Sequence, residues 1–153
     1  MPARKGDSLE ADELWTFVRS KDNPRWVWLV VSFLSRQIVS VAVGDRGLGT
    51  AERLWAGVPR QYRRKRVYTD GYVVYPELLG AWQHRPSPKG GGRTNTVERI
   101  NLTLRQRLAF LVRRTLAFAK REDRLLQRLL LFVHRYNREC ARRYAGTALR
   151  GGR

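Results

Sequence analysis

Cysteine is almost absent from this sequence, and long apolar segments are missing altogether. Cys140 is the only cysteine among 153 residues, which excludes an internal disulfide and a cysteine-based zinc site within the chain. No apolar run approaches the roughly 18 residues that cross a bilayer, and the first residues lack the apolar stretch of a secretory signal. We therefore expect a soluble protein of the cytoplasm, with one core of ordinary domain size.

Acidic residues are also scarce. Thirteen Asp and Glu residues face 31 Lys and Arg residues, which gives a formal net charge of +18. The imbalance is greatest late in the chain, because residues 99–153 hold 15 basic and three acidic residues, against 16 and ten in residues 1–98. A polyanion relieves such self-repulsion, so the composition predicts a nucleic acid as partner. The alternative is a solvated basic surface that faces an acidic protein.

The order of strand-like and helix-like segments predicts a mixed α/β fold. Aromatic and β-branched segments predict strands at residues 14–18, 26–33, 37–43 and 67–69, and a further extended piece at 82–85. Apolar spacing predicts helices at residues 50–56, at 75–79, from 96 onward and from 122 to 143. Turn residues predict a reversal at 21–24 and a Pro- and Gly-rich loop at 86–93.

Three antiparallel strands followed by alternating helices and strands are the element order of an RNase H-like fold. We expect a polar leader over residues 1–8, an RNase H-like core over 9–118, and a basic C-terminal helix and tail over 119–153. The helix that begins near residue 96 has one apolar stripe, formed by Val97, Ile100, Asn101, Leu104, Leu108 and Leu111. In the last helix the expected inward residues are Leu125, Leu129, Phe132, Val133 and Tyr136, and the outward ones are Arg124, Arg128, Arg135 and Arg138.

An RNase H-like fold places carboxylates on its first strand, at the end of its fourth strand and on a late helix. The sequence has an acid at each place: Asp12 beside the first strand, Asp70 after the fourth, and Glu98 in the first turn of the late helix. Two divalent ions about 4 Å apart can hold both the attacking and the leaving oxygen of a phosphodiester. Since Mg²⁺ takes few carboxylates, three acids from distant segments suffice, and these three are candidate catalytic and metal-binding residues.

Each of the three acids also has a structural interpretation. Asp12 belongs to an acidic run before the strand, and Asp70-Gly71 is a common turn pair. Asn95 and Glu98 have the spacing of a capping box at the start of a helix. Helix geometry favours a function for Glu98, because Arg105 lies only about 20° from it, two turns further on. A carboxylate for metal and an Arg for phosphate are then neighbours at one edge of the apolar stripe.

Three segments resemble acidic motifs of the IS-one family of bacterial insertion-sequence transposases. They are residues 10–15 (Glu-Ala-Asp-Glu-Leu-Trp), 69–72 (Thr-Asp-Gly-Tyr) and 97–106 (Val-Glu-Arg-Ile-Asn-Leu-Thr-Leu-Arg-Gln), of which the last is the most specific. Residues 116–120 and 134–137 are similar to the C-terminal part of the same family. The resemblance therefore runs in order through nearly the whole chain.

The resemblance implies a DDE transposase, in which an RNase H-like core cuts DNA at insertion-sequence ends and transfers the cut strand to a target. It selects Asp12, not Glu13, together with Asp70 and Glu98 as ligands of two Mg²⁺ or Mn²⁺ ions. It makes Arg105 the DNA-contacting base of the late helix, with Asn101 near the same edge. Double-stranded DNA is the implied partner, and a homo-oligomer is expected where two ends are brought together.

Members of this family also have an upstream zinc-ribbon and helix-turn-helix part that binds the terminal repeats. No pair of cysteines precedes Asp12. We therefore expect a catalytic part that is fused to or paired with such an upstream part, as a frameshift partner for example. Two alternatives are an RNase H-like structure-specific nuclease or resolvase, and a non-enzymatic basic nucleic-acid-binding protein that needs no carboxylate.

A basic run precedes the fourth expected strand. It contains Arg63, Arg64 and Arg66, and its place next to Asp70 makes it a candidate for contacts with DNA phosphates. The two lone histidines, His84 and His134, are expected to be structural. No partner residue in the sequence supports Cys140 as a nucleophile.

Overall fold

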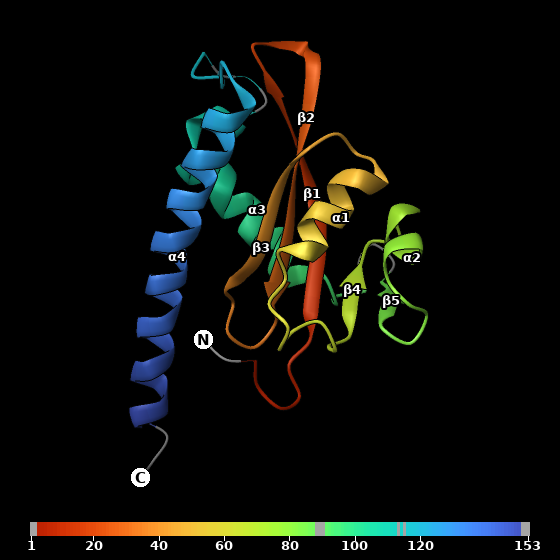
Figure 1. The fold of residues 1–153 in the computed structure, drawn as a ribbon. Coiled ribbons are helices and arrows are strands. Elements are labelled where there is room, and N and C mark those ends of the chain that lie inside the picture. Colours follow the sequence, from red (N-terminus) through yellow and green to blue (C-terminus); the bar gives the residue numbers. More distant parts are fainter. Residues whose placement is uncertain (1–2, 88–90, 113, 115, 151–153) are drawn as a thin grey trace.

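The protein, described here by a computed structural model over residues 3–87, 91–112, 114 and 116–150, has a five-stranded sheet with helices on both faces (Figure 1). Part of the loop expected at 86–93 lies outside these residues. The elements are β1 (Leu9–Val18), β2 (Ser20–Ser32), β3 (Ile38–Gly44), α1 (Leu48–Ala56), β4 (Val67–Thr69), α2 (Val74–Leu78), β5 (His84–Pro86), α3 (Asn95–Arg107), the 3-10 turn η1 (Ala109–Leu111) and α4 (Glu122–Arg150).

The strand order in the sheet is β3-β2-β1-β4-β5. The first three strands are antiparallel because short turns join them, whereas β4 and β5 run parallel to β1. The connection from β3 to β4 carries α1 and that from β4 to β5 carries α2, as parallel pairs require. This mixed sheet with flanking helices agrees with the predicted RNase H-like fold class.

The hairpin of β1 and β2 is longer than predicted at both ends. β1 begins at Leu9 and not at residue 14, so Asp12 lies inside the strand. The turn predicted at residues 21–24 is wrong, because these residues belong to β2 and the chain reverses at Arg19, whose φ is 66°.

Pro24 fits in β2 for a physical reason. It pairs with Phe17 of β1, but the pairing of β2 with β3 ends at Trp26. At Pro24 one side of the strand is therefore an edge, where a missing N–H costs no ladder hydrogen bond.

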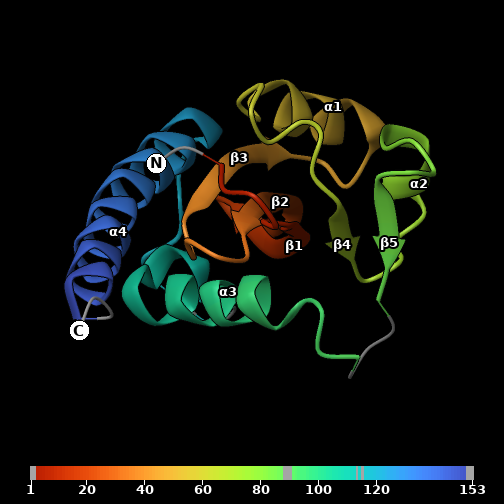
Figure 2. The same ribbon diagram turned by 90° about the horizontal axis from the view of Figure 1, so that it is seen from below.

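The sheet separates two apolar cores (Figure 2). Alternate residues of β1 face opposite ways, with Leu14 and Val18 toward α3 and α4, and Leu9 and Ala11 toward α1 and α2. This alternation decides which acids of β1 reach which helix.

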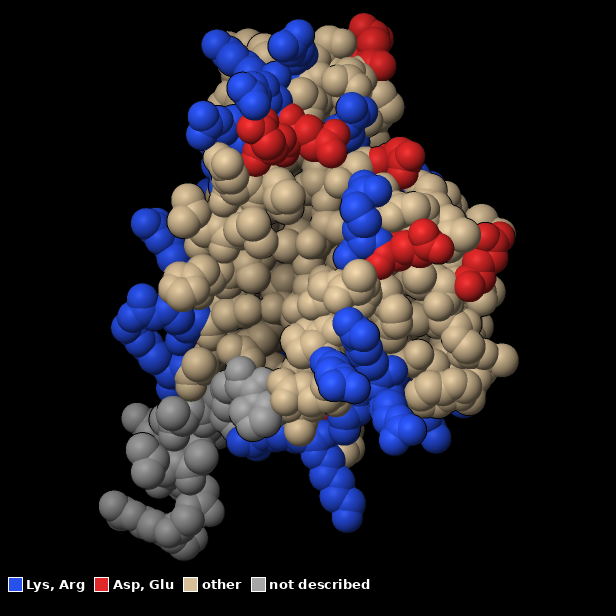
Figure 3. Space-filling model, in the orientation of Figure 1, with Lys and Arg blue, Asp and Glu red and all other residues tan. Residues whose placement is uncertain are grey.

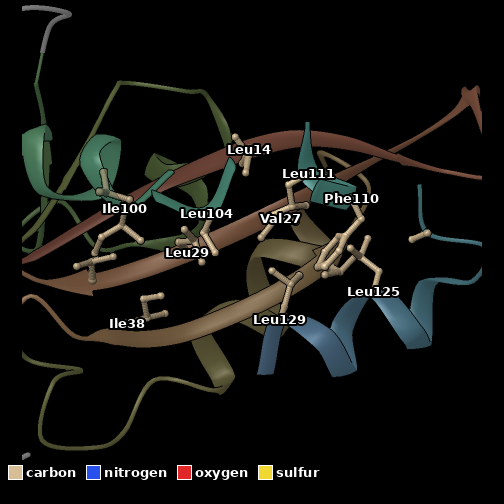
Figure 4. Close-up of a cluster of buried hydrophobic side chains, with 14 of the residues drawn as sticks. Leu14, Val27, Leu29, Ile38, Ile100, Leu104, Phe110, Leu111, Leu125 and Leu129 are labelled. Carbon is tan, nitrogen blue, oxygen red and sulfur yellow. The ribbon is translucent and has the colours of Figure 1, made fainter. Parts of the chain in front are cut away.

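The core under α3 and α4 shows how the late helices attach (Figure 4). Ile100 and Leu104 of α3 and Leu125 and Leu129 of α4 are at most 2% exposed, and full burial of such a side chain stabilises the fold by about 1.5–3 kcal/mol. The predicted inward residues of α4 all belong to this core or pack against it. The apolar stripe of α3 is shorter than predicted, because the helix ends at Arg107 and Leu111 enters the core from η1.

A side-chain amide joins α4 to the edge of the sheet. Asn137 accepts a hydrogen bond from the backbone N–H of Ile38 at 2.9 Å and donates one to its carbonyl at 2.8 Å. The two bonds occupy the backbone of Ile38 as a neighbouring strand would, so α4 covers this end of β3. Among the described residues no helix is long and apolar enough to cross a membrane.

Candidate active site

The three candidate acids come from β1, from the end of β4 and from the start of α3. Leu9 pairs with Val67, and Glu10 with Tyr68, in the parallel register of β1 and β4. Continued by two residues, this register places Asp70, just beyond β4, level with Asp12. Neighbouring strands lie about 4.8 Å apart, so the sheet brings acids from distant parts of the sequence to one place.

Asp12 points toward α3. One of its carboxylate oxygens accepts a hydrogen bond from the side-chain amide of Asn101 at 2.6 Å, and the other accepts the backbone N–H of Glu13 at 2.9 Å. The Asn101 amide thereby fixes the orientation of the carboxylate. Asn101 was expected near this edge, and the structure places it in contact with Asp12.

The surroundings of Asp12 disfavour its charge. Burial raises its pKa first, the neighbouring Glu13 carboxylate adds to this, and Asp70 and Glu98 raise it further, so that the pKa is about 7 although the Glu13 N–H bond lowers it. Asp70 and Glu98 thus act electrostatically on Asp12. Burial and Glu13 have larger effects on this pKa than Asp70 and Glu98.

A pH dependence of stability follows from Asp12. Its pKa is raised from 3.8 to about 7 on folding, so between those values the folded state binds a proton that the unfolded state releases. The free energy of unfolding without metal should then fall as pH rises through this window, by up to roughly 1.4 kcal/mol per pH unit. Urea unfolding in EDTA at pH 5, 6, 7 and 8 measures the slope, which Asp12→Asn should flatten. A parent and variant with parallel profiles would contradict the raised pKa.

Glu98 is exposed in the first turn of α3 and accepts the Thr94 hydroxyl at 2.8 Å. The capping box predicted for Asn95 and Glu98 is wrong, because α3 begins one residue earlier than that box needs, with Thr94 in the capping position and no side-chain cap from it. The Glu98 carboxylate therefore has no part in capping the helix.

Glu10 performs the capping, and the sequence analysis missed it. One of its carboxylate oxygens accepts the backbone N–H groups of Thr96 and Val97 at 2.7 and 2.8 Å, two donors that the first turn of a helix leaves unpaired. Glu10 is only 1% exposed and lies two residues before Asp12, on the same face of β1. A strand assignment that began at Leu9 would have placed Glu10 beside α3.

Asp70 serves a turn and also lies near the other acids. It accepts the backbone N–H of Tyr72 at 3.1 Å, and Gly71 between them has a φ of 88°, a left-handed conformation that glycine adopts without strain. The turn predicted from Asp70-Gly71 is therefore present. Since Asp70 also raises the pKa of Asp12, the structural and functional interpretations are compatible.

Glu13 faces the opposite side of the sheet from Asp12. Its carboxylate is 1% exposed, pairs with Arg46 at 2.6 Å and accepts the Tyr75 hydroxyl at 2.9 Å. The Arg46 guanidinium also lies over the rings of Trp26 and Tyr72, 4.4 and 4.1 Å from their centres. Glu13 is thus bound in a structural network on the face of the sheet opposite Asp12.

The acids suit a divalent cation in kind, but they are not assembled around one. Within the described ranges no group of three or more His, Cys, Asp or Glu side chains is arranged closely enough to hold a metal ion. Their carboxylate oxygens are the kind of ligand that Mg²⁺ prefers. The buried side-chain oxygen of Asn101 (Oδ1) accepts no hydrogen bond among the described residues, and it adds a further oxygen beside Asp12.

The residues predicted to contact DNA fall into two places. On α3, Arg105 is half-buried and follows Asn101 by one helical turn, at the Asp12 side of the helix. In the basic run, Arg64 and Arg66 are exposed, but Arg63 donates to the carbonyls of Val58 and Ala56 and so holds the end of α1. Basic side chains gather at several places on the face drawn in Figure 3, with acidic side chains between some of them.

His84 has a structural contact, as expected. Its ring nitrogen lies 2.9 Å from the Thr69 hydroxyl, which joins β5 to β4 beside Asp70. Burial lowers the pKa of His84, and the neighbouring Arg85 lowers it further. Cys140 belongs to α4 and its side chain is buried.

Known proteins are similar to this chain over most of its length. The family model described as IS1 transposase matches residues 8–134. The InsB protein of insertion element IS1 from Shigella flexneri is 35% identical over 111 residues, which cover 72% of this chain and 82% of that protein. An InsB protein from Escherichia coli K12 is 33% identical over 111 residues, which cover 64% of that protein. Another InsB protein from the same strain is 31% identical over 128 residues, which cover 74% of its length.

The match includes the segments of all three candidate acids and the first part of α4, as far as residue 134. The chain belongs to the IS1 (IS-one) family of insertion-element transposases.

Proposed function

We propose that this chain is the catalytic part of a transposase that cleaves DNA at insertion-element ends and joins the cut strand to a target. Asp12, Asp70 and Glu98 are the proposed catalytic and metal-binding residues. The observation that carries the proposal is the parallel register of β1 and β4, which places Asp70 level with Asp12, in a chain whose match to the IS1 transposase family includes all three acids. A binding protein that needs no carboxylates would not require an acid at each of these three places.

Magnesium or manganese fits this set of oxygen ligands, and two ions would neutralise the scissile phosphate and lower the pKa of a bound water. The residues of the chain prepare the site. The Asn101 amide orients Asp12, and Glu10 fixes the first turn of α3, which carries Glu98. The turn after Asp70 is joined to the segment that follows β3, because the Tyr72 hydroxyl donates to the backbone carbonyl of Arg46 at 2.7 Å.

The residues proposed to contact DNA, other than the acids, are chosen mainly by whether their side chains are exposed. Arg64 and Arg66 precede β4 and are exposed, so they are proposed to contact DNA phosphates. Arg105 and Asn101 would act from α3, beside Asp12. Arg63 is removed from this set because its guanidinium is committed to the end of α1.

Recognition of the terminal repeats is proposed to need an upstream zinc-ribbon and helix-turn-helix part, fused to this chain or paired with it. Since two ends and a target must meet, we also propose a homo-oligomer on DNA. The relatives named above differ in length, so the match covers between 64% and 82% of each.

The direct test is a strand-cleavage and strand-joining assay. A labelled duplex with an insertion-element end is incubated with the protein in Mg²⁺, in Mn²⁺ and in EDTA, with a supercoiled plasmid as target. We expect cleavage with either ion, joining to the plasmid, and neither reaction in EDTA. A protein that gives no metal-dependent product, even with an upstream part supplied, would contradict the proposal.

The pattern of products separates the alternatives. A structure-specific nuclease or resolvase would cleave and release its product without joining it. A basic packaging protein would bind the duplex equally with and without the ion and give no product. Glu52, which is exposed on α1 across the sheet from α3, offers a matched control, because Glu52→Gln removes an acid without touching the site.

A further inference from the structure

One face of α4 carries a continuous row of arginines. At 100° per residue, the row lies within about 40° on either side of the line through Arg124. We call it the arginine ridge; it consists of Arg124, Arg128, Arg135, Arg138 and Arg142, all of them exposed. Four of these were predicted to face outward, and that prediction is confirmed. Basic side chains follow the margin of the molecule where α4 lies (Figure 3).

The acids of α4 do not neutralise the arginine ridge. Glu122 pairs with Arg25, Asp123 with Arg121, and Glu139 with Arg107. Each acid thus has a basic partner outside the ridge. Among the described residues, no member of the ridge forms an ion pair with an acid.

The contacts of the ridge arginines leave their charge available. Arg124 donates to the Gln127 side chain at 3.1 Å, and the Arg128 guanidinium lies 5.6 Å from the centre of the Phe110 ring. Both partners are uncharged. Arg135, Arg138 and Arg142 line a shallow hollow of about 190 Å³ at the middle of the helix, in which Glu139 is the single acid.

We infer that the arginine ridge binds the sugar-phosphate backbone of a DNA duplex, at a surface separate from the catalytic acids; the inference rests on the proposed function. From Arg124 to Arg142 the ridge is about 27 Å long, which equals about eight base pairs of duplex. Guanidinium groups suit phosphate oxygens because they can donate two parallel hydrogen bonds. The exposed Leu131 within the ridge adds an apolar contact for sugar.

The place of α4 separates this surface from the site. α4 packs on β3, at one edge of the sheet, whereas the acids lie on β1, beyond β4 and on the start of α3 (Figure 2). Strand β2 lies between β3 and β1. A second copy of this chain is a poor occupant, because two ridges would place ten arginines against each other in a chain of net charge +18.

The test is the salt dependence of binding to a 30-base-pair duplex without insertion-element sequence, measured by fluorescence anisotropy in EDTA. The triple variant Arg135→Gln, Arg138→Gln, Arg142→Gln should lower the slope of log affinity against log salt by between about two and three, at about 0.9 per lost phosphate contact. Affinity at 0.1 M salt should fall at least about tenfold. The corresponding triple Arg→Lys variant should keep most of the slope, because charge is preserved.

The matched control removes the same charge elsewhere. Lys5→Gln, Lys21→Gln, Arg60→Gln changes three exposed basic residues off the ridge. A control triple that lowers the slope as much as the ridge triple would overturn the inference, and so would an unchanged slope in the ridge triple. Thermal unfolding of both triples checks that the fold is kept.

Two sources of the duplex are distinguished by activity. If the ridge holds the target, the ridge triple should cleave a short end duplex normally and join it poorly to a plasmid. If it holds the flank of the cleaved duplex, the parent should cleave long ends better than short ones, and the ridge triple should lose this advantage. Binding in EDTA needs no catalysis, so failure of the ridge and failure of the proposed function give different results.

Discussion

Asp70→Asn is expected to abolish metal-dependent cleavage and joining, by at least about 10³-fold, while the affinity for DNA stays equal or increases. The reason is chemical, because an amide oxygen replaces an anionic ligand of a hard divalent cation. The fold should survive the change, since an Asn side chain can still accept the backbone N–H of Tyr72 and keep the turn. Binding does not suffer because a negative charge near the phosphates is removed.

The measurement compares cleavage and joining of a labelled end duplex with anisotropy binding on the same preparations. Glu52→Gln serves as the control and should cleave at the parental rate. Normal activity in Asp70→Asn would end the triad hypothesis. Loss of activity together with a lower unfolding temperature would indicate damage to the turn, and the unfolding curve therefore belongs to the same experiment.

A pair of isosteric changes separates catalysis from capping at the start of α3. Glu98→Gln should leave the free energy of unfolding unchanged and remove activity, because the Gln side chain can still accept the Thr94 hydroxyl but has no charge for an ion. Glu10→Gln should cost about 1–2 kcal/mol of stability, since the charge that faces the amides of Thr96 and Val97 is lost.

Urea unfolding and metal-dependent cleavage on both variants give a two-by-two comparison. An active Glu98→Gln protein would leave Asp12 and Asp70 without a third ligand, and we would then abandon the transposase mechanism for a basic binding module. A Glu10→Gln protein as stable as the parent would show that the short contacts to α3 carry little free energy. Unequal losses in the predicted directions support both assignments.

The fold could be predicted from local patterns, because each element has the periodicity or turn residues of its class. β4 was placed at residues 67–69, where the structure has it, and α4 begins at Glu122 as predicted. The errors lie where tertiary pairing overrides local preference. Residues 21–24 have the composition of a turn, yet pairing with β1 extends them into a strand.

The site was predictable only in part, for a similar reason. Acids at the expected places could be found in the sequence, but the partners of each acid depend on the register of β1 against its neighbours. Without that register it could not be predicted that Glu10, and not Glu98, accepts the backbone N–H groups at the start of α3. The same holds for the ion pair of Glu13 with Arg46. The basic run illustrates the limit, since three similar arginines have different surroundings and one of them holds a helix end.

The alternation of β1 has a consequence for how its alignment is fixed. Glu10 and Asp12 face the amides and side chains of α3, whereas Glu13 faces Arg46 and Tyr75. A strand shifted by an odd number of residues would put an apolar side chain against the α3 amides and a carboxylate into the core at the same time. The charged residues on both faces of β1 therefore disfavour any register shift by an odd number of residues. The residues that position the acids thus also help to exclude a misaligned strand.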